Sequence, residues 1–119
     1  MRWLSALALL LPGTALADDA KPWIGIWTAE PEWCAHAVRI GSHNPAPVAL
    51  TADEFLGYEN SCAILRMQRV GALDAWQMRL ECQSEGAIHD EEGLIMTEGR
   101  DVLWWFQGVG DPIRFTRCP

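Results

Sequence analysis

The chain has 119 residues, of which 9 are basic and 16 acidic, and half of its residues are hydrophobic. This length gives room for one domain with a modest core and excludes a second domain. The formal net charge of −7 argues against nucleic acid and anionic lipid as partners, because both are negatively charged themselves.

The N-terminus has the features of a secretory signal peptide. A single charge at Arg2 precedes an apolar run over residues 3–11, and Ala15 and Ala17 supply the Ala-x-Ala pattern that signal peptidases accept. The apolar run is shorter than the about 20 residues that a membrane-spanning helix needs. We therefore expect residues 1–17 to be a cleaved signal peptide. The mature protein is then a single β domain over residues 18–119, periplasmic or secreted, with no membrane span.

The first half of the mature chain predicts short strands separated by turns. Residues 23–27 combine aromatic and β-branched side chains and predict the first strand, and residues 37–40 predict a second. Residues 48–58 then predict a hairpin. In a competing interpretation, Thr51 and Glu54 form a capping box that starts one turn of helix.

The second half carries the clearest strand signals. Residues 62–70 and 75–83 predict a hairpin, because apolar and polar residues alternate over the whole of 75–83 and residues 71–74 favour a turn. Further strands are predicted at residues 94–97, 102–106 and 113–116.

Together these segments amount to about eight or nine short strands in roughly 100 residues. So many short strands leave unpaired edges, which an antiparallel sheet removes when it closes on itself. The expected fold class is therefore all-β: a small antiparallel β-barrel or curled sandwich of about eight strands, held by two disulfides.

The cysteines indicate the redox state of the protein. All four lie in the mature part, and an even number in a short secreted chain indicates two disulfides. Three pairings are possible, and none of the spacings fits a redox Cys-x-x-Cys pair or a zinc knuckle. We favour Cys62–Cys82, because both residues lie near the open end of one predicted hairpin, which leaves Cys34–Cys118 as the second bond.

The residues that usually carry chemistry form no recognisable motif. The sequence has no nucleophile elbow, no phosphate-binding glycine loop and no free-cysteine nucleophile pair. His89, Asp90, Glu91 and Glu92 place an imidazole beside three carboxylates, which favours a solvated loop, with a weak divalent-metal site as the alternative. We expect no catalytic residue, metal or cofactor. The remaining histidines are expected to be ordinary loop residues: His36 and His43.

The pair Trp104 and Trp105 is the strongest candidate for a binding surface. Neighbouring residues on a strand point to opposite faces, so one ring faces solvent or a partner when the other fills the core. We expect Trp105 to form an exposed apolar patch with Leu103. In the alternative, the barrel closes over both rings. The candidate binding residues are thus Leu103, Trp104 and Trp105.

The opening Gly25-Ile26-Trp27, followed by a β meander with four cysteines, resembles a group of small exported proteins of Gram-negative bacteria, most of them of unknown function. The Gly-x-Trp opening is also similar to that of periplasmic inhibitors of secreted metalloproteases, which are small eight-stranded barrels. Those inhibitors reach the protease with an N-terminal arm, whereas here only residues 18–22 precede the first strand. The resemblance therefore implies a barrel fold but carries no functional residue over.

The expected function is a non-catalytic periplasmic or secreted binding or inhibitor module, with a protein or an envelope component as its partner. The alternative is a carrier that holds a small apolar ligand in the mouth of the barrel, which a fully packed interior would exclude. A third hypothesis is a metal-dependent enzyme built on the loop around His89.

Overall fold

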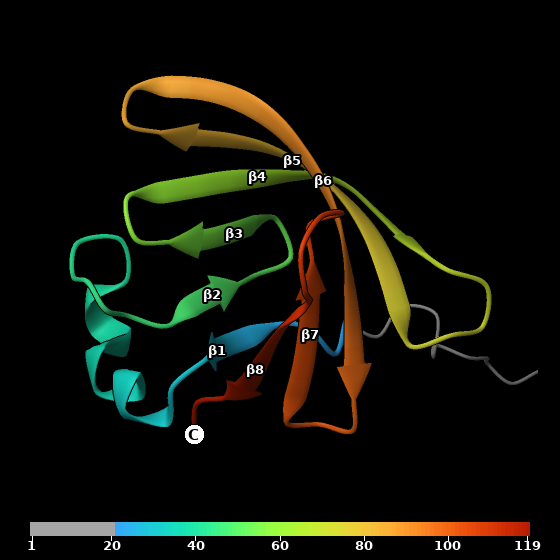
Figure 1. Ribbon diagram of the computed structural model, residues 1–119, viewed down its shortest axis with the longest axis horizontal. Coiled ribbons are helices and arrows are strands. Elements are labelled where there is room, and N and C mark those ends of the chain that lie inside the picture. Colours follow the sequence, from blue (N-terminus) through green and yellow to red (C-terminus); the bar gives the residue numbers. More distant parts are fainter. Residues whose placement is uncertain (1–20) are drawn as a thin grey trace, which may run out of the picture.

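The computed structural model describes residues 21–119, which form a closed barrel of eight antiparallel strands in chain order (Figure 1). The predicted all-β class and the antiparallel barrel are confirmed. The predicted signal peptide, residues 1–17, lies outside the described residues. Within residues 21–119, no helix has the length and apolar character that crossing a membrane requires.

Short turns join most of the strands, and one helical segment lies between the first two. Each strand pairs with its neighbours in sequence, and β8 pairs with β1 to close the barrel. The elements are β1 Gly25–Thr28, η2 Pro31–Arg39, β2 Val48–Leu50, β3 Glu54–Gly57, β4 Asn60–Arg69, β5 Ala75–Ser84, β6 Ala87–Glu98, β7 Val102–Phe106 and β8 Ile113–Arg117.

The core lies inside the barrel and follows the two-residue period of the strands. In β5, the side chains of Trp76, Met78, Leu80 and Cys82 are buried. The residues between them are exposed, as the alternation of residues 75–83 predicts. The hydrophobic effect thus fixes which face of β5 points inward, and the register of β4 and β6 follows from it.

Tryptophan side chains fill one end of the barrel. The indole Nε1 of Trp27 donates a hydrogen bond to the carbonyl oxygen of Trp23 at 2.8 Å. The Trp23 and Trp76 ring centroids are 4.9 Å apart, and none of the three side chains is more than 7% exposed. We call this end the closed end; the β4–β5 loop projects from it, on the right of Figure 1.

Arg117 closes the seam between β8 and β1. Its guanidinium carbon lies 4.2 Å from the centroid of the Trp27 ring, and its two terminal nitrogens donate to the carbonyl oxygens of Ile24 and Pro22 at 2.8 and 2.9 Å. A Cβ atom at Gly25 would collide with this guanidinium. The glycine of the Gly-x-Trp opening is therefore explained by the close approach of Arg117.

The predicted strand at residues 37–40 is wrong. Residues Pro31–Arg39 form the 3₁₀ helix η2, which is kinked at His36 and has no buried residue. Pro31 suits the start of a helix because its ring fixes a helical φ. Proline lacks an amide hydrogen, but at this position an amide hydrogen would have no acceptor within the helix. The disulfide of Cys34 with Cys118 holds this helix to the chain end that follows β8.

The hairpin predicted over residues 48–58 is confirmed as β2 and β3, and the helical alternative is wrong. The hydroxyl Oγ1 of Thr51 accepts hydrogen bonds from the backbone amides of Asp53 and Glu54, at 3.2 and 3.0 Å. Serine and threonine stabilise turns in this way as well as helix starts. The Thr51 side chain therefore holds the turn between two strands.

Strand β6 is longer than predicted. The sequence indicates a strand at residues 94–97 and a loop around His89, whereas β6 starts at Ala87 and pairs with β5 over the whole length of that strand. Glu85 and Gly86 connect the two strands with φ angles of 52° and 82°, which match a two-residue turn of type I′. The difference matters for function, because it places the segment around His89 in the barrel wall.

Both predicted disulfides are confirmed. Cys62 and Cys82 lie directly opposite each other on β4 and β5, with Cα atoms 3.9 Å apart, and neither is more than 3% exposed. Cys34 and Cys118 form the second bond, with Cα atoms 5.6 Å apart. Two structural disulfides fit an oxidising compartment outside the cytoplasm.

Candidate functional site

The predicted binding patch at Leu103, Trp104 and Trp105 does not exist as an exposed surface. Leu103 and Trp105 lie on the inner face of β7 and are 1% and 4% exposed. Trp104 lies on the outer face, is partly buried, and donates from Nε1 to Glu98 Oε1 at 3.1 Å. The expectation that Trp105 and Leu103 are exposed is therefore wrong, because this strand turns that face to the core.

Trp105 instead lines a cavity of about 210 Å³ at the end of the barrel opposite the closed end. We call it the mouth cavity. Strands β2 to β8 each contribute at least one residue to it, and the residues that follow β3 and β7 complete its rim. The apolar side chains that line it are Val48, Phe55, Leu80, Trp105, Ile113 and Phe115. The interior of the barrel is thus packed at one end and open at the other.

Three aromatic rings form the walls of the mouth cavity. The ring centroids of Phe55 and Trp105 are 5.4 Å apart with an interplanar angle of 58°, and Phe115 is also in the lining. None of the three is more than 9% exposed, so the surrounding core holds them in place. The Trp105 ring lies over Gly93 of β6, where a Cβ atom would collide with the indole.

The rim of the mouth cavity is open to solvent and carries both apolar and polar groups. Tyr58, in the turn after β3, is 45% exposed, and Ile113, at the start of β8, is 41% exposed. Polar groups at the cavity come from the hydroxyl of Tyr58, the amides of Asn60 and Gln107 and the carboxylate of Glu91. A ligand in the cavity would therefore meet aromatic side chains inside and both apolar and polar groups at the entrance.

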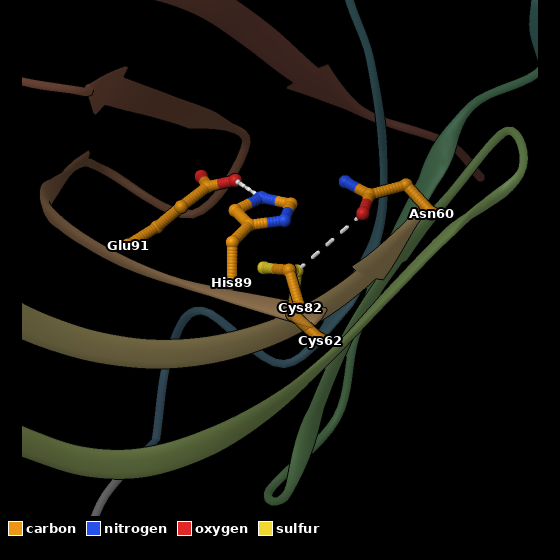
Figure 2. The surroundings of a disulfide bond; sticks show 5 residues. All are labelled: Asn60, Cys62, Cys82, His89 and Glu91. Atoms are coloured by element: carbon orange, nitrogen blue, oxygen red, sulfur yellow. Dashed lines mark hydrogen bonds and ion pairs between the residues drawn. A yellow bond between two sulfur atoms is a disulfide. The ribbon is translucent and has the colours of Figure 1, made fainter. Parts of the chain in front are cut away.

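An imidazole and a carboxylate lie on the inner face of β6, where the carboxylate lines the cavity. Figure 2 shows both side chains beside the disulfide. His89 is paired with Cys82 and Glu91 with Leu80, so both point to the same side of the sheet as these buried residues. His89 Nε2 lies 2.7 Å from Glu91 Oε2, above the disulfide. Glu91, with 29% of its side chain exposed, is the only charged residue among those that line the mouth cavity.

These groups do not make a metal centre. Atoms of Cys82, His89 and Glu91 lie within 4.8 Å of one another, but the Cys82 sulfur is bonded to Cys62 and is not the thiolate that binds metals. Asp90 and Glu92 point to the opposite face of β6, because successive residues of a strand alternate. The four consecutive residues thus divide between the two faces, and two protein ligands remain on the inner one.

Figure 2 also shows the amide of Asn60 beside the disulfide. Its Oδ1 atom lies 3.9 Å from Cys62 Sγ. A disulfide sulfur carries no hydrogen, so this approach is a van der Waals contact in which neither atom donates. Asn60 therefore keeps its amide free to bind water or a ligand at the rim.

The other two histidines stack on each other outside the lining of the mouth cavity. His36 lies in η2 and His43 in the loop that follows; their ring centroids are 4.1 Å apart with an interplanar angle of 20°. Arg39 Nη2 lies 2.9 Å from His36 Nδ1. Partial burial of the imidazole lowers the pKa of His36 below 6.5, and the charges of His43 and Arg39 lower this pKa further.

We expect an NMR titration to show this effect directly. His36 should titrate with a midpoint below 6.5, and His43→Asn should move that midpoint upward, because one of the causes of the lowered pKa is removed. Folding lowers the pKa, so the stacked arrangement is favoured above pH 6.5 and is lost as the pH falls through the lowered value. A midpoint at or above 6.5 in the unaltered protein would contradict the stacking.

A second hollow, of about 380 Å³, lies on the outer side of the sheet near Ile40 and Gly41. It is lined by the ends of β3, β4 and β5 and by the β5–β6 turn, and no aromatic ring contributes to it. Although larger, it has only Ile40 and Leu56 as large apolar side chains in its lining, whereas six line the mouth cavity. The mouth cavity is therefore the stronger candidate site.

The mouth cavity offers apolar contact, aromatic faces and one carboxylate. Its only sulfur atom belongs to a disulfide, and no serine or threonine lines it. Apolar walls with a few polar groups are typical of small-molecule binding sites. Comparison of the chain with models of known protein families, with curated proteins and with solved structures gives no match.

Proposed function

We propose that this protein is a non-catalytic binding protein of the periplasm or the extracellular space, and that it holds a small apolar ligand in the mouth cavity. The observation that carries the proposal is the cavity of about 210 Å³ that Phe55, Trp105 and Phe115 enclose. An apolar cavity that is already formed lets an apolar ligand leave water without a rearrangement of the fold.

The volume of the mouth cavity limits the size of the ligand. An apolar cavity of about 150 Å³ holds one benzene molecule. A cavity of about 210 Å³ therefore suits one aromatic ring with a short substituent, or an alkyl group of similar size. Drug-sized ligands occupy about 300–1,000 Å³ and would extend past the rim.

Two features support the proposed location. Both pairs of cysteines are oxidised, which is typical of proteins outside the cytoplasm. Residues 1–17 have the charge, apolar run and Ala-x-Ala pattern of a cleaved leader. Edman sequencing of the exported product should start at Asp18.

Benzyl alcohol is a neutral probe of the expected size. We expect saturable binding with a dissociation constant of about 1 mM, since small ligands gain roughly 0.5 kcal/mol per non-hydrogen atom. Ile113→Trp places a large ring at the entrance and should weaken binding at least about tenfold, because the added ring occupies space that the probe needs. Saturation-transfer NMR of the probe measures both values without relying on tryptophan fluorescence.

Ile88→Trp is the matched control. Ile88 lies on the outer face of β6, is 64% exposed and does not line the mouth cavity. This variant should bind benzyl alcohol as the unaltered protein does. Equal weakening in both variants, or no saturable binding by the unaltered protein, would rule out the mouth cavity as the site.

A further inference from the structure

We propose that the mouth cavity selects a cationic ligand, a small apolar body that carries an ammonium group, and that Glu91 binds this group. The inference rests on the proposed function and adds the chemical class of the ligand. Glu91 is the only charged residue in the lining, and aromatic rings form part of the same walls.

The position of Glu91 is unusual for a carboxylate. It lies opposite the buried Leu80 on the inner face of β6, while its neighbours Asp90 and Glu92 lie on the outer face. A carboxylate beside apolar walls loses part of its hydration, and this loss is unfavourable unless a cation or a hydrogen-bond donor replaces the water. His89 replaces part of that water at Oε2, and a cationic ligand would replace it at the other carboxylate oxygen.

No fixed cation of the protein lines the cavity to neutralise Glu91. The lining contains no lysine or arginine. Within residues 21–119, the ion-pair partner of Glu91 is His89, which contacts Oε2, and no protein donor reaches Oε1. Charge-assisted hydrogen bonds to carboxylates are stronger than neutral ones, so the free oxygen offers a strong site for an N–H donor.

The walls suit the same kind of ligand. A cation is attracted to the face of an aromatic ring by the ring quadrupole, and tryptophan is the best partner. Trp105 and Phe55 both line the cavity with their rings held by the core. An ammonium group in the cavity next to Glu91 would therefore meet both a carboxylate and aromatic side chains.

The same charges disfavour an anion. Glu91 would repel a carboxylate or phosphate in the cavity, and the formal net charge of −7 adds to this repulsion at long range. A neutral ligand of the same shape keeps the apolar contact alone. The expected order of affinity is thus cation, neutral molecule, anion.

Three one-ring probes of nearly equal size test this order at neutral pH: benzylamine as its ammonium ion, benzyl alcohol and benzoate. We expect benzylamine to bind at least about tenfold more tightly than benzyl alcohol, and benzoate more weakly than either. Glu91→Gln should remove the preference, so that this variant binds benzylamine no more tightly than benzyl alcohol. Calorimetry measures the affinities, and circular dichroism confirms that each variant is folded.

Glu92→Gln is the matched control, because it removes the same charge from the outer face of the same strand. It should leave the affinity for all three probes unchanged. If Glu92→Gln lowers the affinity for benzylamine as much as Glu91→Gln does, net charge alone attracts the probe. This result would overturn the inference.

The unaltered protein gives a test that needs no substitution. Nuclear Overhauser contacts are expected between the methylene protons of benzylamine and the side chains of Trp105 and His89. Equal affinities for benzylamine and benzyl alcohol would overturn the cationic preference and leave the proposed function standing. If neither probe binds, the proposed function fails as well.

Discussion

Replacement of Cys34 and Cys118 together by alanine is expected to lower the free energy of unfolding by about 4–5 kcal/mol. This disulfide joins residues 84 positions apart. The entropy that a crosslink removes from the unfolded chain grows with the length of the loop that it closes. The bond also anchors η2, which has no buried residue to hold it in place. Urea denaturation followed by tryptophan fluorescence measures the loss.

A loss of that size is a large share of the about 5–15 kcal/mol by which small domains are stable. The expected variant is therefore folded only marginally at room temperature. A decrease below about 1 kcal/mol would contradict the role given to this bond. It would mean that the unfolded chain is already so compact that the crosslink removes little of its conformational entropy.

Trp105→Ala is expected to lower the free energy of unfolding by about 3–5 kcal/mol. The side chain is 4% exposed, its ring contacts the Phe55 ring at 5.4 Å between centroids, and its face covers Gly93. Truncation leaves an enlarged cavity in the barrel that the surrounding strands fill only in part. Urea denaturation under the conditions used for the cysteine variant gives the value.

Trp104→Ala is the control for this effect, because it makes the same substitution one residue earlier. Trp104 points outward and its Nε1 hydrogen bond to Glu98 is on the surface. We expect this variant to lose about 1 kcal/mol or less. Equal losses at the two positions would contradict the assignment of Trp105 to the inner face.

Much of the fold follows from the alternation of residues along the strands. The apolar residues of 75–83 fall on every second position and predict β5, and this strand orders the hairpins on both sides of it. The pairing of Cys62 with Cys82 follows from the same hairpin, because the residues near its open end face each other. These predictions succeed because burial of the apolar face of each strand is the largest favourable contribution to the folding free energy of a small barrel.

The first half of β6 was missed for a physical reason. Its inner face carries Ala87, His89, Glu91 and Gly93 in place of large apolar residues, because this stretch borders the open mouth. Without an apolar period, residues 87–93 resemble a solvated loop. The turn at Glu85 and Gly86 was the available signal, since a glycine in a two-residue connection is typical of a hairpin.

The helix η2 was missed for another reason. It has no buried residue, and its nine residues are fewer than the window of about 11–18 over which a hydrophobic period separates helix from strand. The local signals were Pro31 at the helix start, Glu32 in the first turn and Arg39 in the last turn. A disulfide, rather than apolar packing, holds this segment. Because the partner cysteine, Cys118, is 84 residues away, residues 31–39 alone do not indicate this constraint.

The candidate site was only partly predictable. An apolar-ligand carrier was among the hypotheses, but the mouth cavity is assembled from seven strands, and no single stretch of sequence contains it. Alternation predicts that Trp104 and Trp105 point to opposite faces without saying which one points inward. The close approach of Trp105 to Gly93, which decides the question, depends on the pairing of β6 with β7.

Binding in the mouth cavity is tested most directly by the indole N–H signals of the protein in a ¹H–¹⁵N correlation spectrum recorded during addition of benzyl alcohol. Trp105 lines the cavity, whereas Trp23 and Trp76 lie at the closed end. The signal of Trp105 should shift and saturate while those of Trp23 and Trp76 stay in place. An unmoved Trp105 signal, or a shift confined to the closed end, would contradict a ligand site in the mouth of the barrel.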